Sequence, residues 1–156
     1  MARSIRLSSA EAWQVIEGSH TGILTTLRRD GMPISLPVWF AALDRRVYVS
    51  GPARTKKFAR LRHDDRVAFL VETGTAWAKL VGVHLTGTAR EVHDPALLAR
   101  VHDALDAKYS AFRSDRAVMP ARTAEYYETP TITIEIEPHE RILTWDNARL
   151  FAEDPR

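Results

Sequence analysis

Runs in which every second residue is apolar dominate the chain from residue 21 onward. Residues 132–136 carry isoleucine at alternate positions, and Val67, Phe69 and Val71 fall on one face in the same way. Alternation with a period of two is typical of a β-strand that has one face in the core. Helical spacing of apolar residues is confined to three short segments, whereas parallel strands need a crossover between each pair. The sequence therefore predicts an antiparallel sheet.

The predicted strands follow one another as hairpins. Residues 21–27 and 33–42 flank a first turn, and residues 47–50 follow a second turn. Near the end of the chain, residues 142–145 are expected to pair with residues 132–136. This order predicts a mainly β (α+β) fold, a six-stranded antiparallel barrel or strongly coiled sheet with short flanking helices.

The strand predicted over residues 33–42 has two different faces. Ile34, Leu36, Val38 and Phe40 share the face that we expect to enter the core, and Trp39 lies on the opposite face. A tryptophan in that position either stacks on a planar ligand or covers another part of the protein, and packing is the more common role.

A long run from Lys79 to Val92 is interrupted by Gly82 and Gly87. Glycine inside a strand indicates a bulge or a place where another group approaches the backbone. Just before this run, Trp77 and Lys79 supply a second aromatic ring and another cation. The predicted helices lie over residues 8–18, where Ser8 and Glu11 form a capping box, over residues 56–62, and over residues 95–109.

Composition excludes several other classes of protein. The 156 residues predict one domain over residues 1–156, and with no cysteine the chain suits a reducing compartment such as the cytoplasm. No apolar run approaches the roughly 20 residues that span a membrane. The six histidines have no metal-ligand spacing, and the glycine pattern of a Rossmann dinucleotide site is missing. The net charge of +2 does not indicate nucleic-acid binding.

Cations gather where a predicted strand turns into a predicted helix. Ser50, Arg54, Thr55, Lys56 and Lys57 fall within eight residues, and Thr55 is a plausible N-cap. Lysines in the first turn face the positive end of the helix dipole, which is unfavourable unless an anion offsets them. A phosphate held by backbone N–H groups, hydroxyls and cations would do so, while the alternative is a solvated lysine pair.

The order of several segments resembles that of the split β-barrel flavin and deazaflavin oxidoreductases, relatives of pyridoxamine 5′-phosphate oxidase. The segments that carry this similarity are Gly22–Leu27, Asp30–Pro33, Pro37–Phe40, Tyr48–Ser50, Arg54–Lys57, Leu61–Ala68 and Gly87–Ala89. The closing residues Thr144–Asp146, with Arg149 and Leu150, resemble the actinobacterial branch that uses the deazaflavin coenzyme F420.

The resemblance implies a split β-barrel homodimer with a cofactor at the interface between subunits. It places the cofactor phosphate on Ser50, Arg54, Thr55, Lys56 and Lys57, and the cofactor ring along Val38 and Trp39. Trp77 and Lys79 would face a cofactor held mainly by the other subunit.

The implied activity is hydride transfer between F420 and an organic acceptor such as an activated alkene, a quinone or a tetrapyrrole. The catalytic residues stay unassigned, with Tyr126, Tyr127 and His84 as candidate proton donors. Residues 142–145 lack the arginine and histidine that an authentic pyridoxamine phosphate oxidase uses for its substrate, which argues against vitamin B6 oxidation.

Two alternatives remain open at this stage. FMN would use the same phosphate contacts as F420, and the sequence separates the two cofactors poorly. A protein that binds a cofactor, haem or pigment without turning it over belongs to a different class. A deep groove lined by Lys79 and other cations would favour the acidic tail of F420.

Overall fold

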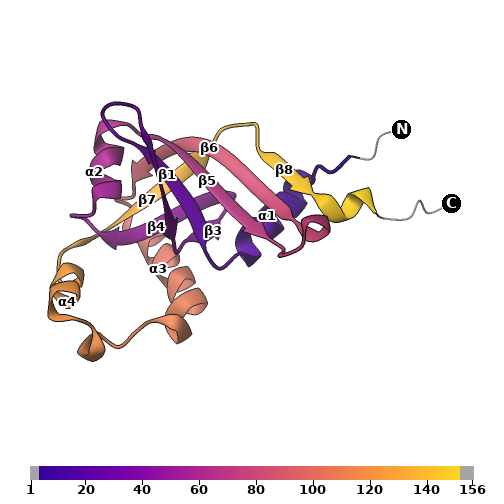
Figure 1. Cartoon of the computed structure of the whole chain (residues 1–156). Helices are drawn as coiled ribbons and strands as arrows, with labels where there is room; N and C mark the ends of the chain where they lie inside the picture. Colours follow the sequence, from indigo (N-terminus) through magenta and orange to yellow (C-terminus); the bar gives the residue numbers. More distant parts are fainter. Residues whose placement is uncertain (1–3, 152–156) are drawn as a thin grey trace.

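The computed structural model describes residues 4–151, and the predicted fold class is confirmed: a curled antiparallel sheet carries a few short helices (Figure 1). The α-helices are α1 (Ser9–Gly18), α2 (Lys56–His63), α3 (Pro95–Tyr109) and α4 (Ala121–Tyr127). The strands are β1 (Gly22–Leu27), β2 (Pro33–Val38), β3 (Ala41–Leu43), β4 (Arg46–Pro52), β5 (Arg66–Thr73), β6 (Val81–Glu91), β7 (Thr131–Pro138) and β8 (Leu143–Asp146). The 3-10 turns are η1 (Trp77–Lys79), η2 (Ser110–Phe112), η3 (Arg116–Val118) and η4 (Asn147–Leu150).

The strands form one sheet in the order β2-β1-β5-β6-β7-β4-β3, with β8 added beside β6. Every pairing in it is antiparallel. The first helix begins as predicted, because the Ser8 side chain accepts from the Glu11 backbone N–H and the Glu11 carboxylate accepts from the Ser8 backbone N–H.

The described residues contain eight strands where the sequence predicted six. One reason is that the run over residues 33–42 is broken at Phe40. There the backbone N–H of Phe40 donates to the Tyr109 hydroxyl, and the Phe40 carbonyl accepts from Tyr109 and from Lys108 of α3. Because these groups bond to a helix instead of a neighbouring strand, the chain leaves the sheet and re-enters it as β3.

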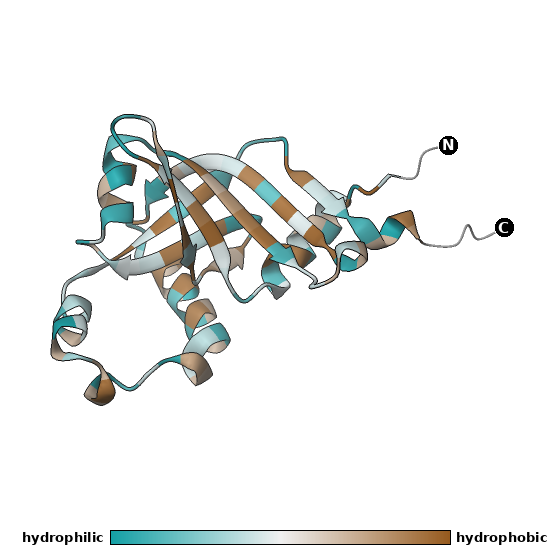
Figure 2. Cartoon of the chain, in the orientation of Figure 1, coloured by the Kyte–Doolittle hydropathy of each residue, from teal (hydrophilic) through white to brown (hydrophobic). Residues whose placement is uncertain are grey.

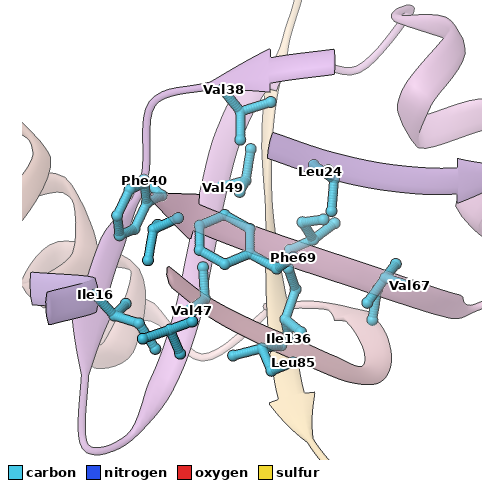
Figure 3. Close-up of a cluster of buried hydrophobic side chains, with 14 of the residues drawn as sticks. Ile16, Leu24, Val38, Phe40, Val47, Val49, Val67, Phe69, Leu85 and Ile136 are labelled. Carbon is cyan, nitrogen blue, oxygen red and sulfur yellow. The ribbon is translucent and has the colours of Figure 1, made fainter. Parts of the chain in front are cut away.

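The prediction of a fully buried face on β2 is wrong in part. Val38 and Phe40 are buried, but Leu36 is 40% exposed and Ile34 is half-buried. Since β2 is an edge strand, only its end at Val38 reaches the core. Figure 3 shows the Val38 side chain directed toward the apolar cluster, next to Val49 of β4.

The prediction that residues 142–145 pair with residues 132–136 is also wrong. β8 pairs with β6 in the register Val81 to Asp146, and not with residues 132–136 of β7. The other side of β8 bonds to the N-terminal segment, since Asp146 N donates to Ile5 O and Leu7 N donates to the Thr144 hydroxyl. β7 is already paired on both sides, with β4 and β6, so that it has no edge left for β8.

Gly82 and Gly87 are places of close approach within an uninterrupted β6. A Cβ on Gly82 would lie 2.0 Å from the Trp145 ring, and one on Gly87 would lie 2.4 Å from the Glu137 carbonyl oxygen. Neither distance leaves room for a side chain, which explains both glycines without a bulge.

Two apolar clusters flank the sheet. The larger one fills the curl and contains residues from α1, α2 and most strands. Figure 2 shows the hydrophobic positions along these elements, and Figure 3 shows part of the cluster as side chains. The smaller one packs Val101, Leu105 and Tyr109 of α3 against Tyr48 of β4 and Ala41 of β3. This second cluster fixes α3 to the outside of the sheet.

Candidate functional site

A cavity of about 780 Å³ lies between the ends of β2 and β4, the last turn of α3, and residues 110–127. These last residues, η2, η3 and α4 with their connections, are called the arch here. In Figure 1 the arch projects from the body of the protein beneath α3. A cavity of this size accommodates a cofactor or a drug-sized molecule.

The β4 side of the cavity is polar and positively charged. Ser50, Gly51, Pro52 and Lys57 line it. A Cβ on Gly51 would lie 3.5 Å from Lys57 Nζ, so the ammonium sits close over the Gly51 backbone. The Ser50 hydroxyl lies 2.6 Å from the hydroxyl of Thr133, which is buried.

Lys57 is a half-buried cation that has no ion pair or hydrogen bond from its ammonium within residues 4–151. Burial lowers its pKa, and the Arg60 guanidinium lowers it further. Both effects penalise the charged form, and an anion bound beside the ammonium would oppose them.

The start of α2 offers unused hydrogen-bonding groups next to Lys57. Thr55 occupies the predicted N-cap position, but its side chain makes no capping hydrogen bond. Its hydroxyl oxygen is buried and has no partner among the described residues. The first N–H groups of a helix without a side-chain cap are free to bind an anion. These observations fit a phosphate group at the β4–α2 junction.

The opposite wall of the cavity is aromatic. The ring of Trp39 stacks on the ring of Tyr109 with 4.5 Å between centroids and 3° between planes. Phe112 also lines the cavity, and His20 contacts all three rings edge-on. Trp39 is 38% exposed, which leaves part of its surface for a planar ligand.

Tyr109 holds this wall in place. Its side chain is fully buried, and its hydroxyl donates to the backbone oxygen of His20 at 2.6 Å or to that of Phe40 at 3.1 Å, while it accepts from Phe40 N at 3.0 Å. The hydroxyl therefore ties α3 to the loop before β1 and to the break between β2 and β3. Burial raises the pKa of Tyr109, so the phenol keeps its proton at neutral pH.

Behind the wall, Lys108 donates to Phe40 O at 3.3 Å and lies 3.7 Å from the centre of the Phe40 ring. Burial lowers the pKa of Lys108 to about 8. The unfolded chain thus binds more protons than the folded one between pH 8 and 10, and stability rises with pH in that range.

We expect the unfolding free energy to increase from pH 8 to pH 9.5 in the wild type and to change less in Lys108→Met. Urea unfolding at four pH values measures this. Lys57, whose pKa burial also lowers, contributes in the same direction, and Tyr48, whose pKa burial raises to about 12, opposes the trend slightly at the top of the range because tyrosine in the unfolded chain begins to lose its proton there. Both contributions are common to the two proteins, so the difference between their slopes reports Lys108. An equal slope in both proteins would contradict the assignment to Lys108.

The structure brings some of the predicted site residues together and separates others. Val38, Trp39, Ser50 and Lys57 line the cavity. Arg54, Thr55 and Lys56 belong to the adjoining turn and helix start but do not line it, and Arg54 and Lys56 are exposed.

Trp77 and Lys79 form η1, which packs against η4 at the β8 end of the sheet. There Trp77 meets Phe151 edge-on, and its backbone oxygen accepts from the Asn147 amide. Neither residue lines the cavity, and both are exposed.

Sequence reasoning missed most of the aromatic wall and all the cations of the arch. Tyr109 follows Val101 and Leu105 on one stripe of α3, a pattern that indicates packing only. Arg113 and Arg116 lie in a segment without periodicity, and only the tertiary structure places them on the cavity. Of the candidate proton donors, Tyr127 lines the cavity, whereas Tyr126 and His84 do not.

The charged side chains that line the cavity all have the same sign, which is positive. Lys57, Arg113 and Arg116 line it, and none of the described residues that line it is acidic. Within residues 4–151 no group of three or more histidine, cysteine or acidic side chains is placed to hold a metal ion. Over the same residues, no helix has the length and apolar character to cross a membrane.

The structure thus combines a curled antiparallel sheet with a cationic and aromatic cavity at one end. The sequence matches the family pyridoxamine 5′-phosphate oxidase over residues 8–140, and the chain belongs to that family. No curated protein matches the chain closely enough to count as a relative.

Solved structures share the fold over most of the chain. A conserved hypothetical protein of Mycobacterium tuberculosis is 27% identical with a TM-score of 0.79, and the match covers 100% of this chain and 96% of that one. The FAD binding protein of Mycobacterium smegmatis is 22% identical with a TM-score of 0.63, covering 88% and 94%. The heme storage protein HutZ of Vibrio cholerae is 10% identical with a TM-score of 0.66, covering 88% and 94%.

Proposed function

We propose that this protein is an oxidoreductase that binds the deazaflavin coenzyme F420 and transfers a hydride between it and an organic acceptor. The observation that carries the proposal is the cavity itself, with the half-buried Lys57 ammonium, which has no ion pair within residues 4–151 and lies 4.7 Å from the centre of the Phe58 ring, at one side and a stacked aromatic wall at the other. A flavin-like molecule has the matching parts, a phosphate and a planar ring. The bound cofactor supplies the hydride chemistry.

In this proposal the residues of the chain bind and orient the cofactor. Lys57, the Ser50 hydroxyl and the free N–H groups at the start of α2 hold its phosphate. Val38 and Trp39 form an apolar edge along which the ring lies, and Tyr109 keeps the Trp39 ring in one plane. The same wall limits the access of water to the ring.

The cationic lining favours F420 over FMN. F420 carries an acidic oligoglutamate tail in addition to its phosphate. Lys79, which the sequence proposed for that tail, does not line the cavity. The side chains that do line it include Lys57, Arg116 and the Asp106-paired Arg113 but no carboxylate, so the cavity has a positive potential that attracts a ligand with several negative charges, without assigning either arginine to the tail.

We also propose that two copies form the working protein, with Trp77 and Lys79 facing a cofactor held mainly by the partner. Support comes from the exposure of apolar residues that a second subunit would cover. Trp77 and Phe151 are each 62% exposed, and they lie beside one another at the β8 end. Sedimentation at micromolar concentration tests this point, and a monomer there would contradict it.

The first test is a fluorescence titration of the purified apo-protein with F420 and, in parallel, with FMN. We expect tighter binding of F420, followed by its oxidation when reduced cofactor is mixed with quinones or activated alkenes. Preference for FMN would mean that the cofactor is FMN and not F420, and the protein would still be an oxidoreductase. Tight binding of a cofactor without turnover of any acceptor, or binding of haem alone, would contradict the proposed oxidoreductase activity. The protein would then be a non-catalytic carrier.

A further inference from the structure

Two arginines of the arch, Arg113 and Arg116, line the cavity. They differ in whether their charge is paired with a carboxylate. The Arg113 guanidinium donates to Asp106 at 2.5 Å, so its charge is compensated. The Arg116 guanidinium has no hydrogen bond or ion pair among residues 4–151. The neighbouring carboxylate, Asp115, is occupied with the Ala117 N–H at 2.9 Å. Of the two arginines that line the cavity, the exposed Arg116 is therefore the one with capacity for a further anion.

Apolar side chains of the arch lie on the same cavity. Phe112, Met119 and Tyr127 line it together with Arg116. Phe112 is 60% exposed and Tyr127 is 46% exposed, although both are large. An aromatic molecule that bound here would cover apolar surface that now faces water, and removing that surface from water favours binding.

We propose that the arch forms a subsite for a flat, apolar carboxylate, with Arg116 as the residue that binds the carboxylate group. A guanidinium matches a carboxylate with two parallel hydrogen bonds, and the surrounding rings match a planar hydrocarbon. We assign the subsite to the organic acceptor, an assignment that rests on the proposed function. The chemically related alternative is the carboxylate tail of the cofactor.

The apolar neighbours favour the acceptor over the cofactor tail. An oligoglutamate chain is polar along its whole length and gains little from contact with Phe112 and Met119. The phosphate of the cofactor already has a place beside Lys57, on the β4 side of the cavity. The arch side is left for the molecule that meets the ring.

The test uses the full-length apo-protein and 2-naphthoate, an aromatic carboxylate whose own fluorescence reports binding. Its neutral counterpart, 2-naphthamide, has the same ring system without the charge. We expect 2-naphthoate to bind about tenfold more tightly than 2-naphthamide, a ratio in the range of a charge-assisted hydrogen bond. In Arg116→Gln the two probes should bind equally, and Arg116→Lys should restore part of the difference.

Arg122→Gln is the matched control, because Arg122 is an exposed arginine of α4 that does not line the cavity. It should leave the probe ratio unchanged. Equal binding of the two probes to the wild type, or an equal loss in Arg116→Gln and Arg122→Gln, would overturn the subsite.

A second arm distinguishes the two sources of the carboxylate. Simultaneous binding of 2-naphthoate and F420 supports the acceptor, whereas displacement of the probe by F420 but not by FMN would overturn that assignment in favour of the tail. The probe experiment needs neither cofactor nor turnover. Its result can therefore contradict the proposed subsite while the proposed function stands, and the F420 titration can contradict the proposed function while the subsite stands.

Discussion

Replacing Lys57 by methionine should weaken cofactor binding by at least about tenfold, since a hydrogen bond to a charged group contributes roughly 1.5–3 kcal/mol. The variant keeps the length and most of the apolar volume of the side chain and removes the ammonium over Gly51. The dissociation constant is measured by fluorescence titration with F420 and with FMN. Both cofactors should be affected, because the proposed binding mode places the phosphate of either one beside Lys57.

Lys56→Met is the matched control for this prediction. Lys56 precedes Lys57 in the chain and carries the same charge, but it is exposed and does not line the cavity. Its loss should change the dissociation constant by less than about threefold, as is usual for an exposed charge. Equal losses in the two variants would mean that only the general positive potential matters and would remove Lys57 from the site.

The folded state itself should tolerate Lys57→Met. Because burial lowers the pKa of Lys57, the apo-protein spends free energy to keep the charge, and methionine removes that cost. An unfolding midpoint at or above that of the wild type, together with weaker cofactor binding, would show that Lys57 serves the ligand. A lower midpoint would indicate a structural role instead.

The second large effect is expected at Tyr109, where two variants separate hydrogen bonding from packing. Tyr109→Phe keeps the ring on Trp39 but leaves the Phe40 N–H without its partner, at a cost of about 1–3 kcal/mol of unfolding free energy. Tyr109→Ala also empties the volume of the ring, and a large aromatic residue truncated in a core typically costs about 3–5 kcal/mol. Urea unfolding measures both values.

The same pair of variants reports on the site. Tyr109→Phe should preserve cofactor affinity within a few fold, because Trp39 keeps its stacking partner, whereas Tyr109→Ala should release Trp39 and broaden its fluorescence emission. Tyr126→Phe is the control, since Tyr126 is an exposed tyrosine whose ring does not line the cavity. Unchanged stability in Tyr109→Phe would contradict the role given to its hydroxyl.

Much of the fold could be predicted because it follows from local rules. Period-two alternation located most strands, and the capping box of Ser8 and Glu11 marked the start of α1. The bounds of α3 were also predicted correctly, from Pro95 at its first turn to the end of its apolar stripe at Tyr109. Each of these signals lies within a few residues of the feature that it specifies.

The errors concern interactions between segments that are distant in the sequence. The run over residues 33–42 looks like one strand, but Tyr109 and Lys108 from α3 capture the backbone of Phe40 and break it. Leu36 has the alternation of a core residue but lies on an edge strand, where it stays 40% exposed. Neither the break at Phe40 nor the exposure of Leu36 can be recognised from the sequence of residues 33–42 alone.

The candidate site also has features that could be predicted from local sequence and features that depend on packing. Ser50, Lys56 and Lys57 could be identified as a possible anion site because a strand end, a turn and a helix start are local features with unfavourable charge placement. The sequence treats Lys56 and Lys57 alike, however, and only the packing of α2 decides that Lys57 is half-buried on the cavity and Lys56 exposed. Their difference is one of environment.

By itself, the sequence determined the strand alternation, the positions of α1, α2 and α3 and the cationic turn, because each depends on residues that are neighbours in the chain, whereas α4 carries no such periodicity and was not predicted. Tertiary structure alone decided that α3 supplies Tyr109 to stack on Trp39, that Arg113 and Arg116 of the arch face the same cavity as Lys57, and that Trp77 and Lys79 lie elsewhere in the subunit. A cavity is formed by surfaces that only packing brings together, and its charge is the sum over Lys57 of α2 and Arg113 and Arg116 of the arch, two segments that are distant in the sequence.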